Sequence, residues 1–386
     1  MKTKEFRTRQ EFFKDHTYPK GKDFIIGLDA GYSSVKVFYE NGYFCFPYYV
    51  KKIEGGMLGV ANDKDIMYKD LTTNEIYMLG TSAQEMISST DTNDMDGESF
   101  SRKRFGNPKF KIACNAALGL ALLENKDQKE VFVSTGLPSA YVDSADKGDL
   151  IKALSKPAHF AIKRGNGNWR EINLNLKQEQ ISVMPQPAGS FYSVLLDKNG
   201  KYIPTAKNFW FKNVLVIDIG FGTFDLFSTQ NRMLSCKESD DQLGMKQVLK
   251  KTSEKIFKTM GEDIRIQALQ KNLETGEVIC MTENEDGMPC SEAKPFENLL
   301  EEASNEVFKE AMSKVKNSTN SFRDYDYIII AGGTGEAWFD NIQNYLSGLK
   351  NVQLIKSNAN DGLPMLYSNV RGYYFFRLVS ENRTKK

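Results

Sequence analysis

The sequence contains few of the residues on which many metalloenzymes and secreted proteins depend. It has two histidines, His16 and His159, and five cysteines. With only two histidines, metal sites or catalytic triads that depend on histidine are close to excluded. The cysteines are odd in number and never spaced C-x-x-C, so we expect reduced thiols and neither a disulfide framework nor a zinc site.

Long apolar runs and an excess of charge are also missing. No apolar run approaches the roughly 20 residues that span a bilayer, and residues 1–22 are too polar for a signal peptide. The formal net charge is +1, which gives no electrostatic reason for direct nucleic-acid or membrane binding. With 386 residues, of which 40% are hydrophobic, the sequence predicts a cytoplasmic globular protein of two or three domains.

What the sequence does contain is a buried-strand pattern that ends in an acid and two glycines. Residues 213–229 read NVLVIDIGFGTFDLFST, with Asp218, Gly220 and Gly222 directly after the apolar run. No helical pattern follows, which predicts a strand–turn–strand hairpin. A carboxylate at a strand end can hold hydrated Mg²⁺, and N–H groups of a turn can bind phosphate. The alternative is an ordinary glycine-rich hairpin with two solvated acids.

The same pattern occurs a second time near the start of the chain. Residues 24–38 read FIIGLDAGYSSVKVF, which places Asp29 on Asp218. The other aligned pairs are Gly31 on Gly220, Ser33 on Gly222, Ser34 on Thr223, Lys36 on Asp225 and Phe38 on Phe227. Such a distant repeat suggests two related domains whose hairpins enclose a phosphate chain from both sides. Lys36 would supply positive charge for phosphate.

A third segment adds a glycine turn that opens a helix. Residues 327–330 form an apolar strand pattern, AGGTG follows at 331–335, and a helical pattern covers 336–349. The N–H groups at such a helix start could receive the ribose, adenine or phosphate of a nucleotide.

Together these motifs resemble those of the actin-like ATPase superfamily, most closely the ParM-type bacterial actins that segregate plasmids. Residues 29–36 resemble the first phosphate loop of that family, 218–225 the second, and 332–335 the adenosine loop. Two further segments, STGLP at 134–138 and VMPQPAG at 183–189, are similar to ParM-like members. The resemblance covers roughly residues 22 to 380.

The resemblance implies an α/β protein of the actin-like ATPase fold, in which two ribonuclease H-like lobes of mixed sheets and helices enclose a nucleotide cleft. Domain I would comprise residues 22–195 and 360–386, with a subdomain IB insertion at about 43–107. Domain II would comprise 196–359, with subdomain IIB at about 246–322. Residues 1–21 form an N-terminal extension without a counterpart, which we interpret as a short surface helix or frayed segment, or else as a filament-contact arm.

The resemblance also implies a binding site for Mg-ATP. Asp29 and Asp218 would position Mg²⁺ through water, and Lys36 would contact phosphate. The remaining implied nucleotide and phosphate contacts are Gly31, Tyr32, Ser33, Ser34, Gly220, Phe221, Gly222, Thr223, Gly244, Lys246, Gly332, Gly333, Thr334 and Gly335. Of these, Gly244 would approach the ligand closely and Lys246 or Gln247 would face the ribose, at the start of an expected helix over 245–260.

Gln186 occupies the position at which the family orients the water that attacks the γ-phosphate. ParM-like proteins typically carry Glu there and eukaryotic actin carries Gln, so this sequence departs towards actin. An amide is not a strong base, but phosphoryl transfer depends mainly on positioning and charge stabilisation, so an orienting Gln suffices. The alternative is a residue at a helix start without a catalytic role.

The function implied is ATP-driven filament assembly (GTP remains possible) that moves plasmid DNA through a ParR-type adaptor. A cell-shape or division actin of the MreB or FtsA type is the nearest alternative. For the aromatic run at 373–376 we expect core packing instead of membrane anchoring. A sugar or acetate kinase would need a carboxylate base near its acceptor, of which the sequence has no distinctive candidate. A DnaK-type chaperone would need a substrate-binding domain after the ATPase.

Overall fold

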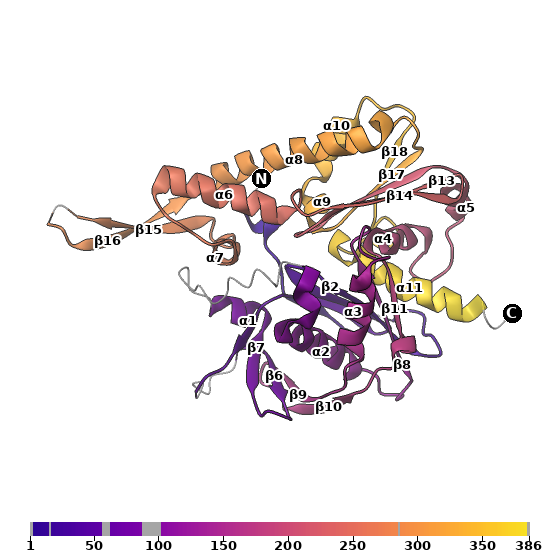
Figure 1. The fold of residues 1–386 in the computed structure, drawn as a ribbon, viewed down its shortest axis with the longest axis horizontal. Coiled ribbons are helices and arrows are strands. Elements are labelled where there is room, and N and C mark those ends of the chain that lie inside the picture. Colours follow the sequence, from indigo (N-terminus) through magenta and orange to yellow (C-terminus); the bar gives the residue numbers. More distant parts are fainter. Residues whose placement is uncertain (1–2, 15–16, 56–61, 87–101, 285, 384–386) are drawn as a thin grey trace.

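The computed structural model describes residues 3–14, 17–55, 62–86, 102–284 and 286–383. In Figure 1 the chain forms two halves, a lower one coloured indigo to magenta and an upper one coloured salmon to orange. Each half is built on its own large sheet. The last helix, drawn in yellow, returns the chain from the upper half to the lower one.

The sheet of the lower half has the strand order β1-β4-β3-β2-β8-β11. Its central strand β2 forms because Phe24–Ala30 is apolar almost throughout, and all seven residues are buried. The strands are β1 (Glu11–Phe13), β2 (Phe24–Ala30), β3 (Ser34–Tyr39), β4 (Gly42–Pro47), β8 (Val131–Leu137) and β11 (Ile181–Pro185). The helices of this half are α1 (Gly80–Glu85), α2 (Pro108–Leu122), α3 (Ala145–Ser155), α4 (Gln186–Leu195) and α11 (Ser368–Arg383).

The sheet of the upper half has the order β14-β13-β12-β17-β18. This order repeats β4-β3-β2-β8-β11 of the lower sheet. In both sheets the first two pairings along the order are antiparallel and the last two are parallel. The strands are β12 (Val214–Ile219), β13 (Phe224–Gln230), β14 (Met233–Asp240), β17 (Tyr327–Ala331) and β18 (Gln353–Lys356). The helices are α5 (Ala206–Phe211), α6 (Met245–Met260), α7 (Ile266–Asn272), α8 (Glu297–Ser318), α9 (Gly333–Ala337) and α10 (Phe339–Leu346). The shared topology is the structural form of the repeat seen in the sequence.

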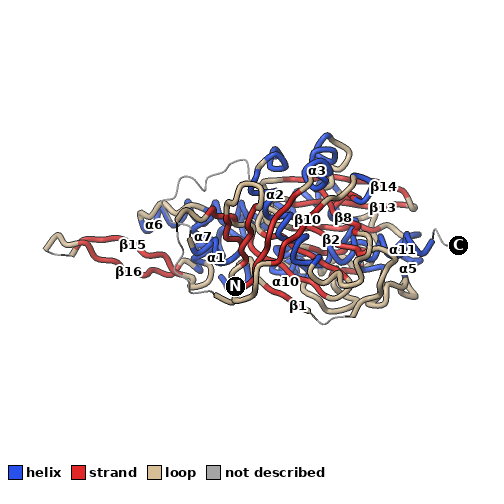
Figure 2. The backbone as a smooth tube through the Cα atoms, turned by 90° about the horizontal axis from the view of Figure 1, so that it is seen from below, coloured by secondary structure: helices blue, strands red, loops and turns tan. Residues whose placement is uncertain are grey.

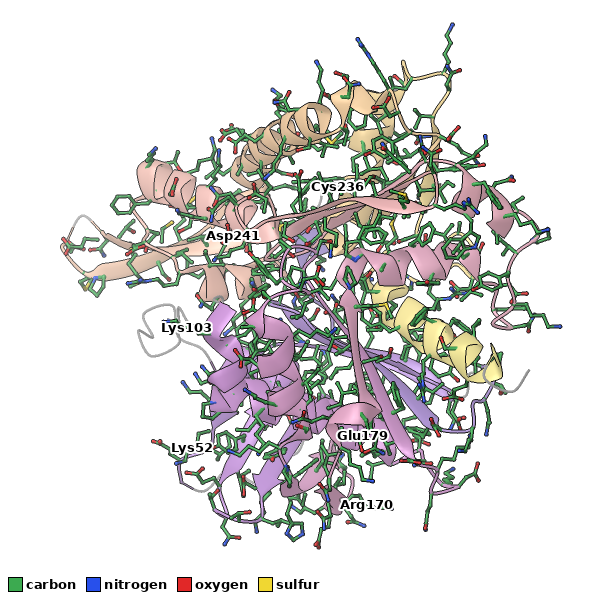
Figure 3. All side chains as sticks on the ribbon, turned by 45° about the vertical axis from the view of Figure 1, so that its right-hand side comes forward. Lys52, Lys103, Arg170, Glu179, Cys236 and Asp241 are labelled. Carbon is green, nitrogen blue, oxygen red and sulfur yellow. The ribbon has the colours of Figure 1, made fainter. Side chains whose placement is uncertain are left out.

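A smaller sheet extends the lower half, with the order β10-β9-β6-β7-β5. Its strands are β5 (Val50–Lys52), β6 (Ile66–Asp70), β7 (Ile76–Leu79), β9 (Ala158–Arg164) and β10 (Arg170–Leu174). The insertion expected at 43–107 therefore supplies only part of this sheet, because β9 and β10 come from later in the chain and β4 pairs within the large sheet. In Figure 3, Lys52 and Arg170 mark this end of the molecule, far from Cys236 and Asp241 in the upper half.

A two-stranded hairpin projects from the upper half. It consists of β15 (Glu277–Glu283) and β16 (Pro289–Pro295), which pair only with each other. Figures 1 and 2 both show it extending away from the rest of the protein.

Helices α4 and α11 pack against each other and form a core that the two halves share. This core includes Phe38 from β3, Phe191 from α4 and Val216 from β12. In α11, Tyr373, Tyr374 and Phe375 are fully buried there, so the aromatic run packs in the core as the sequence predicts. None of the described helices is both long and apolar enough to cross a membrane.

The N-terminal segment differs from the surface helix or frayed extension expected from the sequence. A 3₁₀ helix, Thr3–Phe6, is followed by strand β1, which adds to the edge of the large lower sheet. Phe6 is buried in the core of the upper half. Further 3₁₀ helices lie at Arg102–Gly106, Gln178–Gln180, Asn320–Phe322 and Met365–Tyr367.

Candidate functional site

The two acid-tipped hairpins have the same backbone geometry. The amide of Gly31 donates to the carbonyl of Ser34 over 2.9 Å, and the amide of Gly220 donates to the carbonyl of Thr223 over the same distance. In the strand register Asp29 lies opposite Lys36, and Asp218 lies opposite Asp225. Residues aligned between the two sequence copies therefore occupy the same position within their own hairpins.

The two turns are in contact with each other. A Cβ atom added at Gly222 would lie 2.3 Å from Cδ2 of Tyr32, so the Tyr32 ring packs directly on the glycine backbone. Only glycine leaves room for this contact. The guanidinium of Arg104 also lies over the Tyr32 ring, with its central carbon 4.2 Å from the ring centroid. The hairpins of the two halves thus face each other at close range.

In the first hairpin, two neighbouring side chains donate hydrogen bonds to the Asp29 carboxylate. The Lys36 ammonium donates to Oδ2 of Asp29 over 2.9 Å, and Nε2 of Gln186 donates to Oδ1 over 3.0 Å. Burial lowers the pKa of Lys36, but the Asp29 carboxylate more than offsets this and raises it overall. Gln186 reaches Asp29 because it is the first residue of α4, held between Pro185 and Pro187 at the end of β11.

In the second hairpin, two acids face each other. Burial raises the pKa of Asp218 to about 7, against a hydrogen bond from Nδ2 of Asn369 over 2.7 Å. Asp225 accepts hydrogen bonds from the Ser139 amide over 2.9 Å and from the Ser239 hydroxyl, and burial raises its pKa as well. Among the described residues, no lysine or arginine forms an ion pair with either acid. This hairpin therefore holds two buried carboxyl groups without an ion pair, and Lys36 of the first hairpin acts on Asp218 only at longer range.

The glycine turn after β17 is fixed to the second hairpin. Gly332 has φ of 83°, and a Cβ there would lie 2.3 Å from the Ile219 carbonyl oxygen and 2.6 Å from Oδ1 of Asp218. The Thr334 hydroxyl donates to the Gly220 carbonyl over 3.0 Å. The start of α9 is thus held beside the acid that ends β12.

These elements surround one cleft of about 470 Å³, within the size range of small-molecule sites. It is bounded by both halves and by the start of α4. The site residues expected from the sequence that line it are Asp29, Gly31, Tyr32, Ser33, Ser34, Lys36, Gln186, Asp218, Gly220, Phe221, Gly222, Thr223, Gly332, Gly333 and Thr334.

Three expected site residues do not line the cleft. A Cβ at Gly244 would lie 2.5 Å from the Phe221 carbonyl oxygen, and the Lys246 amide donates to that same oxygen over 2.8 Å. Gly335 packs on Ile330 of β17. Gly244 and Lys246 thus support the second hairpin from behind, and Gly335 seats α9 on its strand.

Several lining residues were not predicted from the sequence. Asn369 comes from α11, and Arg104 from the 3₁₀ helix before α2. Arg104 is 4% exposed, and its Nη1 has no hydrogen-bond partner in the part of the chain that the structure describes. Residues 5–9 of the N-terminal segment also line the cleft. No local motif marks these positions, because each reaches the cleft through contacts distant in sequence.

The carboxylates in the cleft fit the metal ion of a magnesium nucleotide. The described residues hold no group of three or more His, Cys, Asp or Glu side chains that could enclose a metal ion. Mg²⁺ needs no such group, because it usually keeps several waters and takes one or two carboxylates together with phosphate oxygens. The buried carboxyl of Asp218 could serve as such a ligand, and Asp29 of the other hairpin lines the same cleft.

Residues 27–189 match the family model described as the N-terminal domain of actin like proteins. This segment holds the first hairpin and the start of α4. No curated protein matches the chain significantly in sequence.

Solved structures extend the likeness to the whole chain. It is similar to the apo psk41 ParM protein at 20% identity, with a TM-score of 0.62 over 95% of this chain and 100% of that one. A 15-stranded ParM filament from Clostridium botulinum matches at 19% identity, with a TM-score of 0.67 over 92% and 98%. The archaeal actin homologue Ta0583 in complex with ADP matches at 15% identity, with a TM-score of 0.56 over 94% and 99%. The predicted actin-like α/β fold and the resemblance to ParM-type proteins are confirmed.

Proposed function

We propose that this actin-like protein binds Mg-ATP between its two halves, assembles into filaments, and hydrolyses the nucleotide to control filament turnover. In the cytoplasm such filaments would move plasmid DNA through a ParR-type adaptor. The observation that carries the proposal is the contact between two equivalent acid-tipped hairpins at one cleft. The similarity to a ParM filament and to an actin homologue bound to ADP supports it.

The two turns supply the phosphate contacts in this proposal. Backbone N–H groups at 31–34 and 220–223 would donate to phosphate oxygens, and Lys36 would add positive charge. Asp218, with Asp29 across the cleft, would hold Mg²⁺ through water; the cation supplies neutralisation of the phosphate charge. Gly332 and Gly333 would leave room for the adenosine beside the second hairpin.

Gln186 would orient the attacking water. Its Nε2 donates to Asp29, which leaves the amide oxygen as an acceptor for a water O–H. A Glu at this position would instead place a second carboxylate against Asp29. The hydrogen bond to Asp29 would thereby fix the direction of the acceptor, and positioning of this kind is the main protein contribution to phosphoryl transfer.

Nucleotide binding would also select one arrangement of the two halves. A ligand held by both turns stabilises the arrangement in which the turns lie close, by its difference in affinity for the closed and open forms. We expect this arrangement to be the one that polymerises, with hydrolysis weakening it.

The proposal is tested by light scattering and pelleting of the purified chain with Mg-ATP, with Mg-ADP and without nucleotide. Polymer with ATP, and less with ADP, is the expected result. The control is Asp218→Ala, which should not polymerise at the same nucleotide concentration. A chain that stays monodisperse with every nucleotide, yet transfers phosphate to a sugar or acetate, would instead be a kinase of the same superfamily. Assembly only on lipid vesicles would indicate a cell-shape or division actin.

A further inference from the structure

The N-terminal segment Thr3–Phe13 is attached to both halves of the molecule. Its first attachment is to the upper half. Phe6 is buried in that core, the Arg7 guanidinium pairs with Glu274, and Thr3 packs on the turn at Gly276. The 3₁₀ helix also packs against α9, the helix that follows the glycine turn.

The second attachment is to the lower half. In β1, Phe12 pairs with Phe44 of β4, and their rings stack with centroids 5.1 Å apart. The guanidinium of Arg164 covers the other side of Phe12, 3.7 Å from its centroid. Gln10 accepts from the Thr81 amide over 2.9 Å, at the start of α1. Opening the halves widely would therefore break one of the two attachments.

Between its attachments the segment crosses the cleft. Residues 5–9 line the cavity together with Glu336 and Asp340, which belong to α9 and α10. Arg9 and Glu336 line the same cavity. Burial raises the pKa of Glu336, and the Met365 amide, Lys356 and Arg9 oppose this shift. Figure 1 shows the indigo N-terminal segment passing from the upper half towards the lower one.

We propose that Thr3–Phe13 is a wall of the nucleotide site: a strap that closes the nucleoside end of the cleft, joins the two halves across it, and retains the bound nucleotide. This inference rests on the proposed function. It assigns the strap mainly to the nucleoside, because the 3₁₀ helix Thr3–Phe6 packs against α9 and lies beside α10 in the cleft lining. Only at Arg9, whose carbonyl accepts from the Cys45 thiol opposite Lys36, does the strap approach the first hairpin. Release of nucleotide then requires the strap to detach from one half.

The experiment compares release of a fluorescent ADP with binding of inorganic tripolyphosphate, both with Mg²⁺, in the full chain. Phe6→Ala removes the apolar attachment to the upper half and should speed ADP release by on the order of tenfold or more. Tripolyphosphate has no nucleoside, so its affinity should change less than about twofold. The matched control is Glu277→Ala, which removes an exposed carboxylate of the upper half three residues from Glu274, outside the cleft lining, and should leave both unchanged.

A second variant covers the case in which Phe6→Ala does not fold. Glu274→Ala removes the partner of Arg7 at a half-exposed position outside the cleft lining, and should speed ADP release about two- to fivefold. Unchanged ADP release in a folded strap variant overturns the inference, and so does an equal loss of ADP and tripolyphosphate binding. A wild-type chain that binds neither ligand overturns the proposed function itself, and the strap assignment with it.

Discussion

The two hairpins that meet at the cleft share their strand register and turn hydrogen bond but differ in charge. In the first, Asp29 lies opposite Lys36 and the two form an ion pair of 2.9 Å. In the second, Asp218 lies opposite Asp225, and both carboxyl groups have raised pKa values because they are buried. The same turn thus occurs twice, and the residue opposite the acid, Lys36 or Asp225, decides whether that acid has an ion partner.

This difference separates two tasks that a nucleotide site requires. The first hairpin is neutral by itself and carries the one cation of the pair, which suits contact with phosphate oxygens. The second hairpin has two buried carboxyl groups and no cation of its own, so a bound cation would favour their ionised forms, which suits the metal side of a magnesium nucleotide. If the tasks are divided in this way, equivalent positions of the two hairpins should respond differently to the same substitution.

The largest expected effect comes from removing the cation of the first hairpin. Lys36→Met leaves Asp29 buried without its ion partner, and the free energy of unfolding should fall by about 3 kcal/mol, the lower end for a broken buried pair because Lys36 partly reaches solvent. Urea denaturation measures this. Lys36→Met with Asp29→Asn should recover most of the stability but not nucleotide binding. A loss below about 0.5 kcal/mol would show that the pair contributes little.

The same substitution at the two equivalent acids should have opposite effects on stability. Asp29→Asn removes the partner of Lys36 and should destabilise the nucleotide-free protein by roughly 1–2 kcal/mol. Asp218→Asn removes a buried carboxyl that has no ion pair while its side-chain oxygen can still accept from Asn369, and should stabilise the protein by about 1 kcal/mol at pH 8, above the Asp218 pKa of about 7, and by less at pH 5. Thermal unfolding without nucleotide measures both. Shifts of the same sign would contradict the assignment of unequal charge to the two hairpins.

The hairpins could be predicted from the sequence because their signals are local. An apolar run, an acid and a glycine turn within ten residues determine a strand, its end and the turn, and the repeat determines which residues correspond. Helix α6 was predicted with its observed limits, since its apolar spacing and the glycine residues on either side, Gly244 and Gly261, are also local.

The parts that could not be predicted depend on distant contacts. Strand β1 has three residues, and nothing in them indicates that they pair with β4. Arg104 and Asn369 reach the cleft only because α2 and α11 pack where they do. The contact of Gly244 is of this kind too: a Cβ there would lie 2.5 Å from the Phe221 carbonyl oxygen, a packing reason for glycine that the sequence does not show, and its approach to a ligand stays a prediction.

Substitution of Gln186 tests the hydrolysis step without changing the charge of the lower half. Gln186→Ala removes the acceptor proposed to orient water and should slow hydrolysis by at least about tenfold, or roughly 1.4 kcal/mol in the barrier. Nucleotide affinity should stay within about threefold, because Lys36 and the turn amides remain. A single-turnover phosphate-release assay separates the two. An unchanged hydrolysis rate would remove Gln186 from the mechanism.

The smallest expected effect concerns the point at which the hairpins touch. Ser33 and Gly222 are equivalent positions, yet only Gly222 lies against the Tyr32 ring, where a Cβ would come within 2.3 Å of Cδ2. Gly222→Ala should therefore displace Tyr32 and weaken nucleotide binding about threefold to tenfold, at a cost of about 1 kcal/mol. Ser33→Ala adds no atom at the equivalent position and should change affinity less than about twofold.

A double variant tests whether displacement of the Tyr32 ring causes the weaker nucleotide binding of Gly222→Ala. Tyr32→Ala combined with Gly222→Ala removes the clash, so the double variant should bind nucleotide no more weakly than Tyr32→Ala alone. Isothermal titration of all four proteins with Mg-ADP gives the coupling between the two positions. Additive losses would mean that Gly222 is needed for the phosphate turn itself and not for the contact between the hairpins. Strong coupling would show that the ligand is held by two hairpins packed on each other, one from each half.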